Sequence, residues 1–285
     1  MTLLGRKGWL AVVLLASVVA LSSGVFGRFF GRSRLRFPYL TGPIAAAEYQ
    51  ALAAEPGWSA RQISVAPGIH LNGLVRRPKA ADAPWLLFYQ GNDATLLRVG
   101  QAFLKQVAAD RDWGLAVYAY RGYDGSEGVP HLADLVSDAP EILTQMCATE
   151  QVDRSRVHIV GFSIGGHFAV HAMAAAQAVQ PRPASLSLLA SVNDIVMFRR
   201  SAYQKLDPGD DMQTRPFLAG VPAPVLVIQG TADEALGGAQ QGRDIAQTLG
   251  DRAKYLELPG LGHKALLSND VATGAVRDFI AAHSK

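Results

Sequence analysis

The sequence of 285 residues contains one cysteine, Cys147, so an internal disulfide and a metal site built from several cysteines are both excluded. It also lacks a large excess of charge, because 27 Lys and Arg residues stand against 24 Asp and Glu residues. Several of the basic residues lie near the N-terminus, so the rest of the chain has no basic footprint that would indicate a nucleic-acid partner. Internal repeats are absent, and so are low-complexity segments other than Ala-rich helical stretches.

Apolar residues, in contrast, are plentiful. They make up 49% of the sequence and charged residues 18%, a balance that argues against intrinsic disorder. When the N-terminal segment is set aside, about 250 residues remain, which is enough for one sizeable hydrophobic core.

The N-terminus has the order of charges and apolar residues that is typical of a signal peptide. Arg6 and Lys7 precede an uncharged apolar run, Trp9 to Leu21, and small residues follow it. Extended to Phe26, the run approaches the length of a membrane anchor, and no cysteine follows it that could carry a lipid. We expect residues 1–36 to be a signal peptide or a membrane anchor with a basic linker, and a buried helix of the folded domain is the third alternative. The protein is therefore expected to be membrane-anchored, secreted or periplasmic.

Residues 37–285 are expected to form one α/β domain. Two short runs separated by Pro67-Gly68, at 63–65 and 69–75, indicate an antiparallel hairpin. Further apolar runs predict strands at 85–89, 115–120, 157–162, 184–190, 225–229 and 255–258. Helix-length segments fall at 95–109, 132–149, 164–179, 239–249 and 269–282. Apolar strands joined by helical crossovers predict a mostly parallel central sheet with helices on both faces. The long interval 192–222 interrupts this order and is expected to be a small cap insertion.

The sequence Gly161-Phe162-Ser163-Ile164-Gly165-Gly166 is the strongest candidate for chemistry. It lies at the end of a predicted strand and at the start of a predicted helix, which is the context that a nucleophile elbow requires. Glycine suits these positions because the elbow strains the serine backbone and brings strand and helix close together. Ser163 is therefore the candidate nucleophile, and the alternative is an ordinary Gly-rich turn between strand and helix.

A serine nucleophile needs a base, and the base needs an orienting carboxylate. Asp233 follows the predicted strand 225–229 and is the leading carboxylate, while Glu234 and Asp194 stay open as alternatives. The alternative for Asp233 is a structural role, as a loop acid that caps the next helix. His263 lies in a Gly-rich loop after the last predicted strand, where a base could reach the same edge of the sheet.

The other six histidines are weaker candidates for the base. His167 and His171 share one face of the helix after Ser163, which suggests a metal pair or helix packing. We favour packing, because no third ligand is apparent.

Two backbone amides are needed to hold an oxyanion. We expect the first from Ile164, the residue after the nucleophile, and the second from Asn92, in the loop after the strand 85–89. Gly91 would allow the close approach that such a loop needs. The alternative is a tight turn at Gly91-Asn92 with no catalytic role.

Four segments in this order resemble the α/β-hydrolase superfamily, and in particular its membrane-anchored branch of lysophospholipase-like and acyl-thioesterase-like proteins. They are 87–92, the Tyr-Arg-Gly-Tyr segment at 118–128, the elbow at 161–166, and the Asp233 and His263 pair. The resemblance spans about residues 60–283 and implies the α/β-hydrolase fold. It also implies that the segment 118–128 is a loop packed under the active site, in which Arg121 and Ser126 are structural.

The chain departs from that branch at two positions. Gln90 stands where a histidine is usual, and Asp124 stands where a glycine is usual. Gln90 can still form hydrogen bonds, whereas Asp124 either adds a charge near the site or indicates a reshaped loop.

Together these features predict a serine hydrolase that cleaves carboxylic esters or thioesters through an acyl-enzyme, without a metal or an organic cofactor. The apolar N-terminal segment and the apolar residues of the expected cap favour a lipid-like acyl ester substrate, although cap packing explains the latter equally well. An aminopeptidase or amidase is the first alternative, because the acidic segment 207–211 could bind a substrate amine. A non-catalytic, membrane-tethered binding protein is the second, and the departures at Gln90 and Asp124 motivate it.

Overall fold

The computed structural model describes residues 44–93, 95–194 and 213–284. The predicted N-terminal segment, 1–36, lies outside the described residues, and so do residues 195–212 of the predicted cap. Both therefore stay predictions. None of the helices in the described part of the chain has the length and hydrophobicity needed to cross a bilayer.

One sheet of eight strands forms the centre of the described domain. The strands are β1 (Trp58–Ala66), β2 (Ile69–Arg76), β3 (Trp85–Tyr89), β4 (Gly114–Tyr118), β5 (Val157–Phe162), β6 (Ser185–Leu189), β7 (Val225–Gly230) and β8 (Ala253–Leu258). Their order across the sheet is β1-β2-β4-β3-β5-β6-β7-β8. Strand β2 is antiparallel to β1 and β4, while all other neighbours are parallel. The predicted mostly parallel sheet is confirmed, and so is the predicted hairpin.

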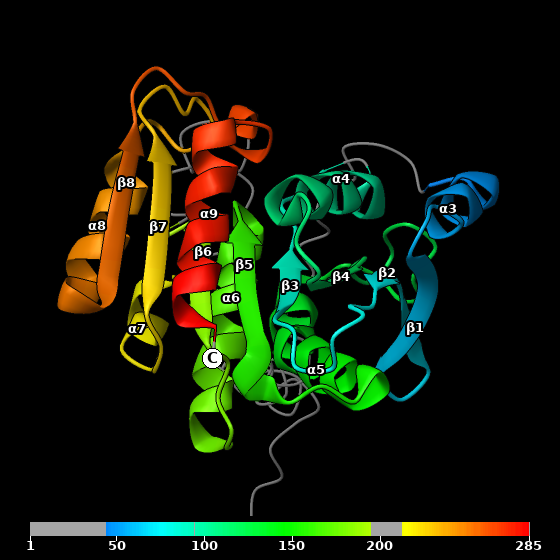
Figure 1. The fold of residues 1–285 in the computed structure, drawn as a ribbon. Coiled ribbons are helices and arrows are strands. Elements are labelled where there is room, and N and C mark those ends of the chain that lie inside the picture. The colour runs from blue at the N-terminus through cyan, green and yellow to red at the C-terminus, as the bar shows by residue number, and fades with distance from the viewer. Residues whose placement is uncertain (1–43, 94, 195–212, 285) are drawn as a thin grey trace, which may run out of the picture. The chain divides into compact units, whose positions relative to one another are not determined.

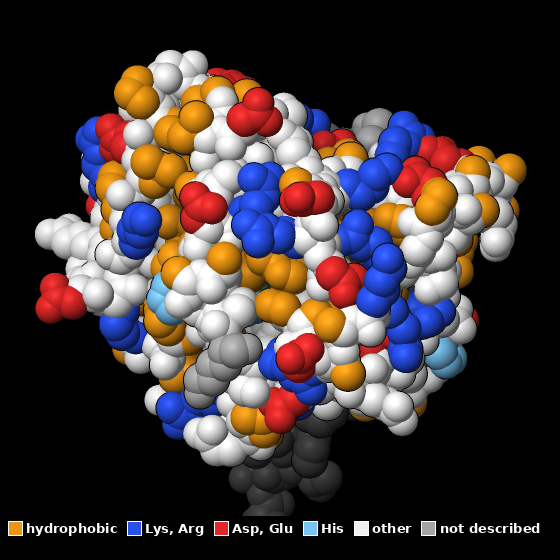
Figure 2. All heavy atoms as spheres, in the orientation of Figure 1, with side chains coloured by type: hydrophobic (Ala, Val, Ile, Leu, Met, Phe, Trp, Pro, Cys, Tyr) orange, Lys and Arg blue, Asp and Glu red, His pale blue; other side chains and the backbone are white. Residues whose placement is uncertain are grey.

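Helices cover both faces of this sheet, as the sequence predicts (Figure 1). The helices are α3 (Ala46–Ala53), α4 (Leu96–Ala108), α5 (Leu132–Glu150), α6 (Ile164–Ala175), α7 (Arg215–Leu218), α8 (Gln240–Leu249) and α9 (Asp270–His283). Helices α4 and α9 pack together on one face, and α5, α6 and α8 lie on the other. On the outer side of the α4 and α9 layer, acidic and basic side chains are interspersed (Figure 2).

The central strands are buried along their whole length, which explains why they could be located from the sequence. Every residue of β3, β5, β6 and β7 is buried. A parallel strand with helices on both faces has no solvent side, so an uninterrupted apolar run is the pattern that it requires. Cys147 is likewise buried, within α5, where burial raises the pKa of its thiol to about 11.

Two features at the β1 edge of the sheet were not predicted. Strand β1 begins at Trp58, five residues before the predicted hairpin strand. This first half was missed because residues 59–62 are half-buried or exposed and form no apolar run. Helix α3 buries none of its residues fully, so it has no apolar face that a sequence pattern could reveal. Its Tyr49 hydroxyl instead donates to the carbonyl oxygens of Gly73, at 2.9 Å, and Arg61, at 3.3 Å.

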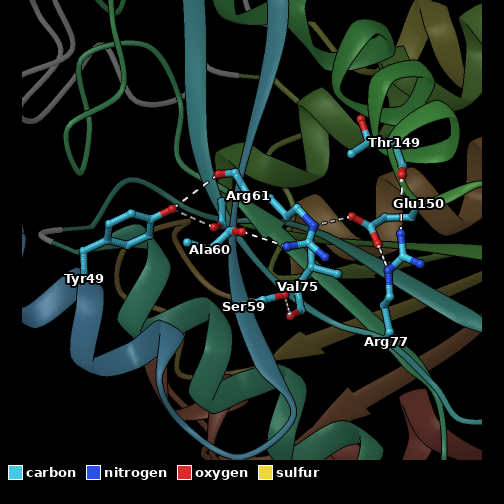
Figure 3. Close-up of polar contacts among 9 residues, drawn as sticks. Tyr49, Ser59, Ala60, Arg61, Val75, Arg77, Thr149 and Glu150 are labelled. Atoms are coloured by element: carbon cyan, nitrogen blue, oxygen red, sulfur yellow. Dashed lines mark hydrogen bonds and ion pairs between the residues drawn. The ribbon is translucent and has the colours of Figure 1, made fainter.

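The same edge is fastened to helix α5 by a buried carboxylate (Figure 3). The side chain of Glu150 is fully buried and accepts from Nε of Arg61, at 2.7 Å, and from Nε of Arg77, at 2.5 Å. A buried carboxylate is tolerated only where partners of opposite charge satisfy it. Two arginines from the hairpin therefore fix its position against the C-terminal end of α5.

Burial of His158 makes the stability of this fold depend on pH. His158 lies on β5, with Nδ1 at 2.7 Å from Oγ of Ser185 and Nε2 at 3.2 Å from Oγ of Ser284. Burial, and to a lesser extent the nearby His283, lowers its pKa to about 4. In the unfolded chain this histidine has an ordinary pKa, so it binds a proton first as the pH falls. The folded state therefore loses stability as the pH falls from about 6.5 to about 4.

We expect His158→Gln to reduce this loss, because glutamine does not titrate. The difference between the free energies of unfolding at pH 7 and pH 5, measured by urea denaturation, should shrink by on the order of 1–2 kcal/mol relative to the wild type. An equal difference in both proteins would contradict the assignment of the buried, neutral histidine.

Candidate active site

The residues predicted to carry chemistry lie at the edge of the sheet where the parallel strands end. Ser163 follows β5, Asp233 follows β7 and His263 follows β8. The arrowheads of these three strands point to the same edge (Figure 1). There the Oγ atom of Ser163 lies 3.0 Å from Nε2 of His263, and Nδ1 of His263 lies 2.8 Å from Oδ2 of Asp233. The structure thus brings the three predicted residues into one hydrogen-bonded chain.

The tautomer of His263 follows from its two partners. An ionised carboxylate can only accept, so the hydrogen on the imidazole is assigned to Nδ1, which donates to Asp233. The lone pair of Nε2 then faces the hydroxyl of Ser163 and can take its proton. The ring of Phe162 packs against the imidazole, with 4.8 Å between the ring centroids, and limits its movement.

Ser163 itself has a strained backbone. Its φ is 56° and its ψ is −124°, a conformation that L-residues rarely adopt. Neighbouring backbone groups hold it in place: its N–H donates to Leu189, and its carbonyl accepts from Gly166 and Val192. The serine side chain therefore stands at the tip of a sharp turn between β5 and α6.

Glycine is required in the elbow because a side chain at these positions would clash with the backbone. A Cβ atom on Gly161 would lie 2.6 Å from Cα of Gly166, and one on Gly165 would lie 2.1 Å from the carbonyl oxygen of Tyr89. Both contacts are to backbone, which cannot turn aside as a side chain can. Helix α6 can approach the end of β3 this closely only because these positions carry no side chain.

The carboxylate of Asp233 is buried and fully engaged. Its Oδ2 accepts from Nε2 of Gln229, at 2.7 Å, as well as from His263, and its Oδ1 accepts from the N–H of Leu236, at 2.8 Å. Glu234 takes a different place, because its Oε2 accepts from the backbone N–H of His263 at 3.4 Å. The imidazole therefore contacts Asp233 and not the adjacent acid.

The other residues considered for chemistry lie elsewhere. Asp194 pairs in an isolated bridge with Gln213. Nδ1 of His167 lies 2.8 Å from the hydroxyl of Thr214, and burial lowers the pKa of His167 to about 3. Its ring also packs on that of His171, with 4.6 Å between the centroids. His167 thus joins helix α6 to the residue before α7, and His171 packs on Phe217 of α7, as the packing interpretation predicts.

The two predicted oxyanion amides flank the nucleophile. Ile164 is the first residue of α6, and Asn92 follows Gly91. A Cβ on Gly91 would lie 3.1 Å from Cβ of Ser163, so this loop runs directly beside the serine. Among the described residues, neither the amide of Ile164 nor that of Asn92 has a hydrogen-bond acceptor.

The segment 118–128 lies next to this loop, and the residues expected to be structural make structural contacts. Arg121 binds Asp138 of α5 through two hydrogen bonds, at 2.5 and 2.6 Å. The hydroxyl of Ser126 accepts from the N–H of Asn72 and donates to the carbonyl of Ala119. Asp124, the departure from glycine, is buried, and burial raises its pKa. It points to helix α4 and does not contact the three-residue chain.

An ion pair joins the two loops that flank the serine. Nζ of Lys264 lies 2.8 Å from Oδ2 of Asp93. Lys264 directly follows His263, and Asp93 directly follows Asn92, so the pair links the loop of the candidate base to the loop of the candidate oxyanion donor. Within the described part of the chain, no group of three or more His, Cys, Asp or Glu residues is arranged to hold a metal ion.

Sequence reasoning missed the residues that support this site. Gln229 gave one signal, because it is an amide at the end of an apolar strand, four residues before Asp233. The ion pair between Asp93 and Lys264 gave none, because 171 residues separate its partners.

The comparisons with known proteins agree with this architecture. The chain matches no protein-family model. It is 26% identical over 279 residues, 95% of each chain, to the uncharacterized protein Rv2307c of Mycobacterium tuberculosis. Among solved structures it is similar to an alpha-beta hydrolase from Vibrio vulnificus, with a TM-score of 0.68, 17% identity and coverage of 84% of this chain and 87% of that one. It is also similar to the Pyrococcus furiosus esterase Pf2001, with a TM-score of 0.66, 10% identity and coverage of 88% and 98%.

At these identities the structural likeness shows the fold. The chain has the α/β-hydrolase fold, as the sequence predicts. The narrower resemblance to a membrane-anchored branch stays a prediction.

We expect Gly165→Ala to be strongly destabilising, because its methyl group would collide with the backbone of β3. Overpacking of this kind should lower the free energy of unfolding by about 3 kcal/mol. Gly274→Ala is the matched control, because Gly274 lies in helix α9 and nothing lies within 4 Å of its added Cβ. That variant should gain roughly 0.5–1 kcal/mol. Urea denaturation measures both, and equal stability of the two variants would contradict the close approach at the elbow.

Proposed function

We propose that the protein is a serine hydrolase that cleaves carboxylic esters or thioesters through an acyl-enzyme. The observation that carries this proposal is the hydrogen-bonded chain from Ser163 through His263 to the buried carboxylate of Asp233. A buried acid, an imidazole of defined tautomer and a strained serine form a geometry suited to activating a hydroxyl for nucleophilic attack.

In the proposed reaction Nε2 of His263 removes the proton from Oγ of Ser163 as Oγ attacks the acyl carbon. Asp233 keeps Nδ1 protonated and stabilises the imidazolium that forms. The tetrahedral adduct then expels the alcohol or thiol, which receives the proton from Nε2. Water, deprotonated by the same nitrogen, attacks the acyl-enzyme, and the carboxylic acid is released while Ser163 regains its proton.

The negative oxygen of the tetrahedral adduct is held by the backbone amides of Ile164 and Asn92 in this proposal. Two observations support it: both amides flank Ser163, and neither has an acceptor among the described residues. The positive end of the α6 helix dipole adds to the stabilisation, because the helix begins at Ile164. Loss of one such donor typically reduces the rate by about 10²–10³-fold.

A lipid-like acyl ester is the proposed substrate class. The apolar N-terminal run from Trp9 to Leu21 supports it, because a chain attached to a membrane meets substrates that partition there. The structural similarity to the Pyrococcus furiosus esterase agrees with ester cleavage. The acidic segment 207–211, which would favour an amine-containing substrate, lies outside the described residues.

We expect a fluorophosphonate probe to label the folded wild-type protein covalently and Ser163→Ala not at all, because the probe reacts with an activated serine hydroxyl. Labelling is measured by gel fluorescence or intact-protein mass. Ser137→Ala, on the exposed side of α5, is the control and should label like the wild type. An unlabelled wild type would contradict the hydrolase and favour the non-catalytic binding protein.

We expect His263→Ala to lower kcat for p-nitrophenyl acetate by roughly 10⁴- to 10⁶-fold, because Ser163 would lose its base. The control is His70→Ala in the edge hairpin, where His70 contacts Glu127. It should retain wild-type turnover. Substantial turnover by His263→Ala would assign the base to another residue.

A further inference from the structure

The loop after β4 supports the loop that carries the second proposed oxyanion donor. Strands β3 and β4 are neighbours in the sheet, so the loops that follow them lie side by side. The hydroxyl of Tyr120 donates to the carbonyl oxygen of Gln90, at 2.8 Å. The hydroxyl of Tyr123 donates to Oδ1 of Asn92, at 2.9 Å. Two residues of one loop thus hold two residues of the other, on either side of Gly91.

The loop at Gln90–Asp93 has little support of its own. The side chain of Gln90 makes one long hydrogen bond, from Nε2 to the carbonyl of Leu96 at 3.4 Å, and its Oε1 is buried without a partner among the described residues. Gly91 has no side chain, and Thr95, the N-cap residue of α4, makes no side-chain hydrogen bond to the helix. The conformation of this loop therefore depends on contacts from outside it.

Asp124 supplies the missing cap of helix α4. Its Oδ2 accepts from the N–H of Leu97, at 2.7 Å, and its Oδ1 from the N–H of Ile44, at 3.4 Å. A carboxylate at this position satisfies amides that the start of a helix leaves without partners, and it is favoured by the helix dipole. Asp124 has a φ of 46°, a left-handed conformation that aspartate tolerates better than most residues do. The helix that continues the Asn92 loop is thus fixed by the same neighbouring segment.

The loop after β4 is itself held in place by packing and by an ion pair. The ring of Tyr120 packs edge-on against Phe168 of α6, with 5.1 Å between the centroids, and edge-on against Tyr123, at 6.4 Å. Arg121, between the two tyrosines, is bound to the buried carboxylate of Asp138. The loop that carries the hydroxyl groups of Tyr120 and Tyr123 therefore contacts helix α6 on one side and helix α5 on the other.

We infer that Tyr123 is a positioning residue of the reaction, which holds Asn92 so that its backbone amide meets the oxyanion, with Tyr120 and Asp124 fixing the two ends of the same loop. This inference rests on the proposed hydrolase function and on Asn92 as a donor. Tyr123 acts through Asn92 and need not touch the substrate. Of the two departures from the branch that the sequence resembles, Gln90 lies at the start of this loop, and Asp124 binds the first turn of the helix that follows it.

The test is Tyr123→Phe, which removes one oxygen atom and keeps the ring packing. Because the amide of Asn92 stays present but is held less firmly, we expect kcat for p-nitrophenyl acetate to fall about tenfold, less than the 10²–10³-fold loss of a whole donor, with KM unchanged. Tyr89→Phe is the matched control, since the buried hydroxyl of Tyr89 also donates to a backbone carbonyl, that of Ala139 in α5, at 2.6 Å. Similar melting temperatures of the two variants, with a kcat loss only in Tyr123→Phe, support the inference.

A pair of inhibitors separates positioning from general damage to the fold. A trifluoromethyl ketone adds to Ser163 and places an oxyanion between the two amides, whereas the methyl ketone of the same shape binds mainly as the intact ketone. Tyr123→Phe should lower the affinity for the trifluoromethyl ketone by the same factor as it lowers kcat. It should leave the affinity for the methyl ketone unchanged. Equal weakening of both inhibitors would overturn the inference.

A double-mutant cycle tests whether Tyr123 acts through Asn92. Asn92→Ala removes the oxygen that Tyr123 binds but keeps the backbone amide, so the double variant should be no slower than the slower single variant. Additive losses would overturn the inference. If the wild type hydrolyses esters and Tyr123→Phe hydrolyses them at the same rate, the inference about Tyr123 is overturned and the hydrolase proposal stands. A wild type that neither hydrolyses esters nor reacts with fluorophosphonate would overturn both.

Discussion

The close approach of helix α6 to the end of strand β3 is the constraint on which the candidate site depends. Gly165 lies against the carbonyl groups of Tyr89 and Gln90, at a separation that no Cβ atom permits. This contact brings the candidate nucleophile close to the loop that carries Asn92. The sharp turn at Ser163, with its positive φ, lies two residues before it. The geometry of the candidate site thus depends on backbone packing at this point of the fold.

Each buried charge near the site is matched by donors from another element. Asp233 receives three hydrogen bonds, Asp138 is paired with Arg121, and Asp124 receives backbone amides. Away from the site, Glu150 follows the same rule with two arginines. Because an unpaired buried charge is costly, each of these pairings fixes the relative position of the elements that it joins. The loops around Ser163 are therefore held by polar contacts, although the sheet beneath them is held by apolar packing.

The central strands of the sheet could be predicted from the sequence because they are buried on both faces. The predicted strands 85–89 and 157–162 have the bounds that the structure shows, and the other strands differ by one or two residues, except at the hairpin. Ser163 and Asp233 could be located because each follows such a strand, whereas His263 was located by its Gly-rich loop after the edge strand β8, which has no fully buried residue. Helix α3 could not be located, since none of its residues is fully buried and only Tyr49, Leu52 and Ala53 pack partly buried against the core. Tyr123 and the pair between Asp93 and Lys264 gave no such signal, because their roles depend on which loops the fold brings together.

The spacing of the site along the chain has a consequence for biosynthesis. Ser163 and His263 are 100 residues apart, and the imidazole is carried by a loop after the last strand. A chain emerging from the ribosome contains the elbow sequence before it contains β8, so in the proposed hydrolase the serine then has no base. The imidazole of His263 reaches Ser163 only when β7 and β8 have joined the edge of the sheet. In the proposed hydrolase, chemical competence therefore coincides with completion of the domain, and a chain that ends before β8 lacks the base.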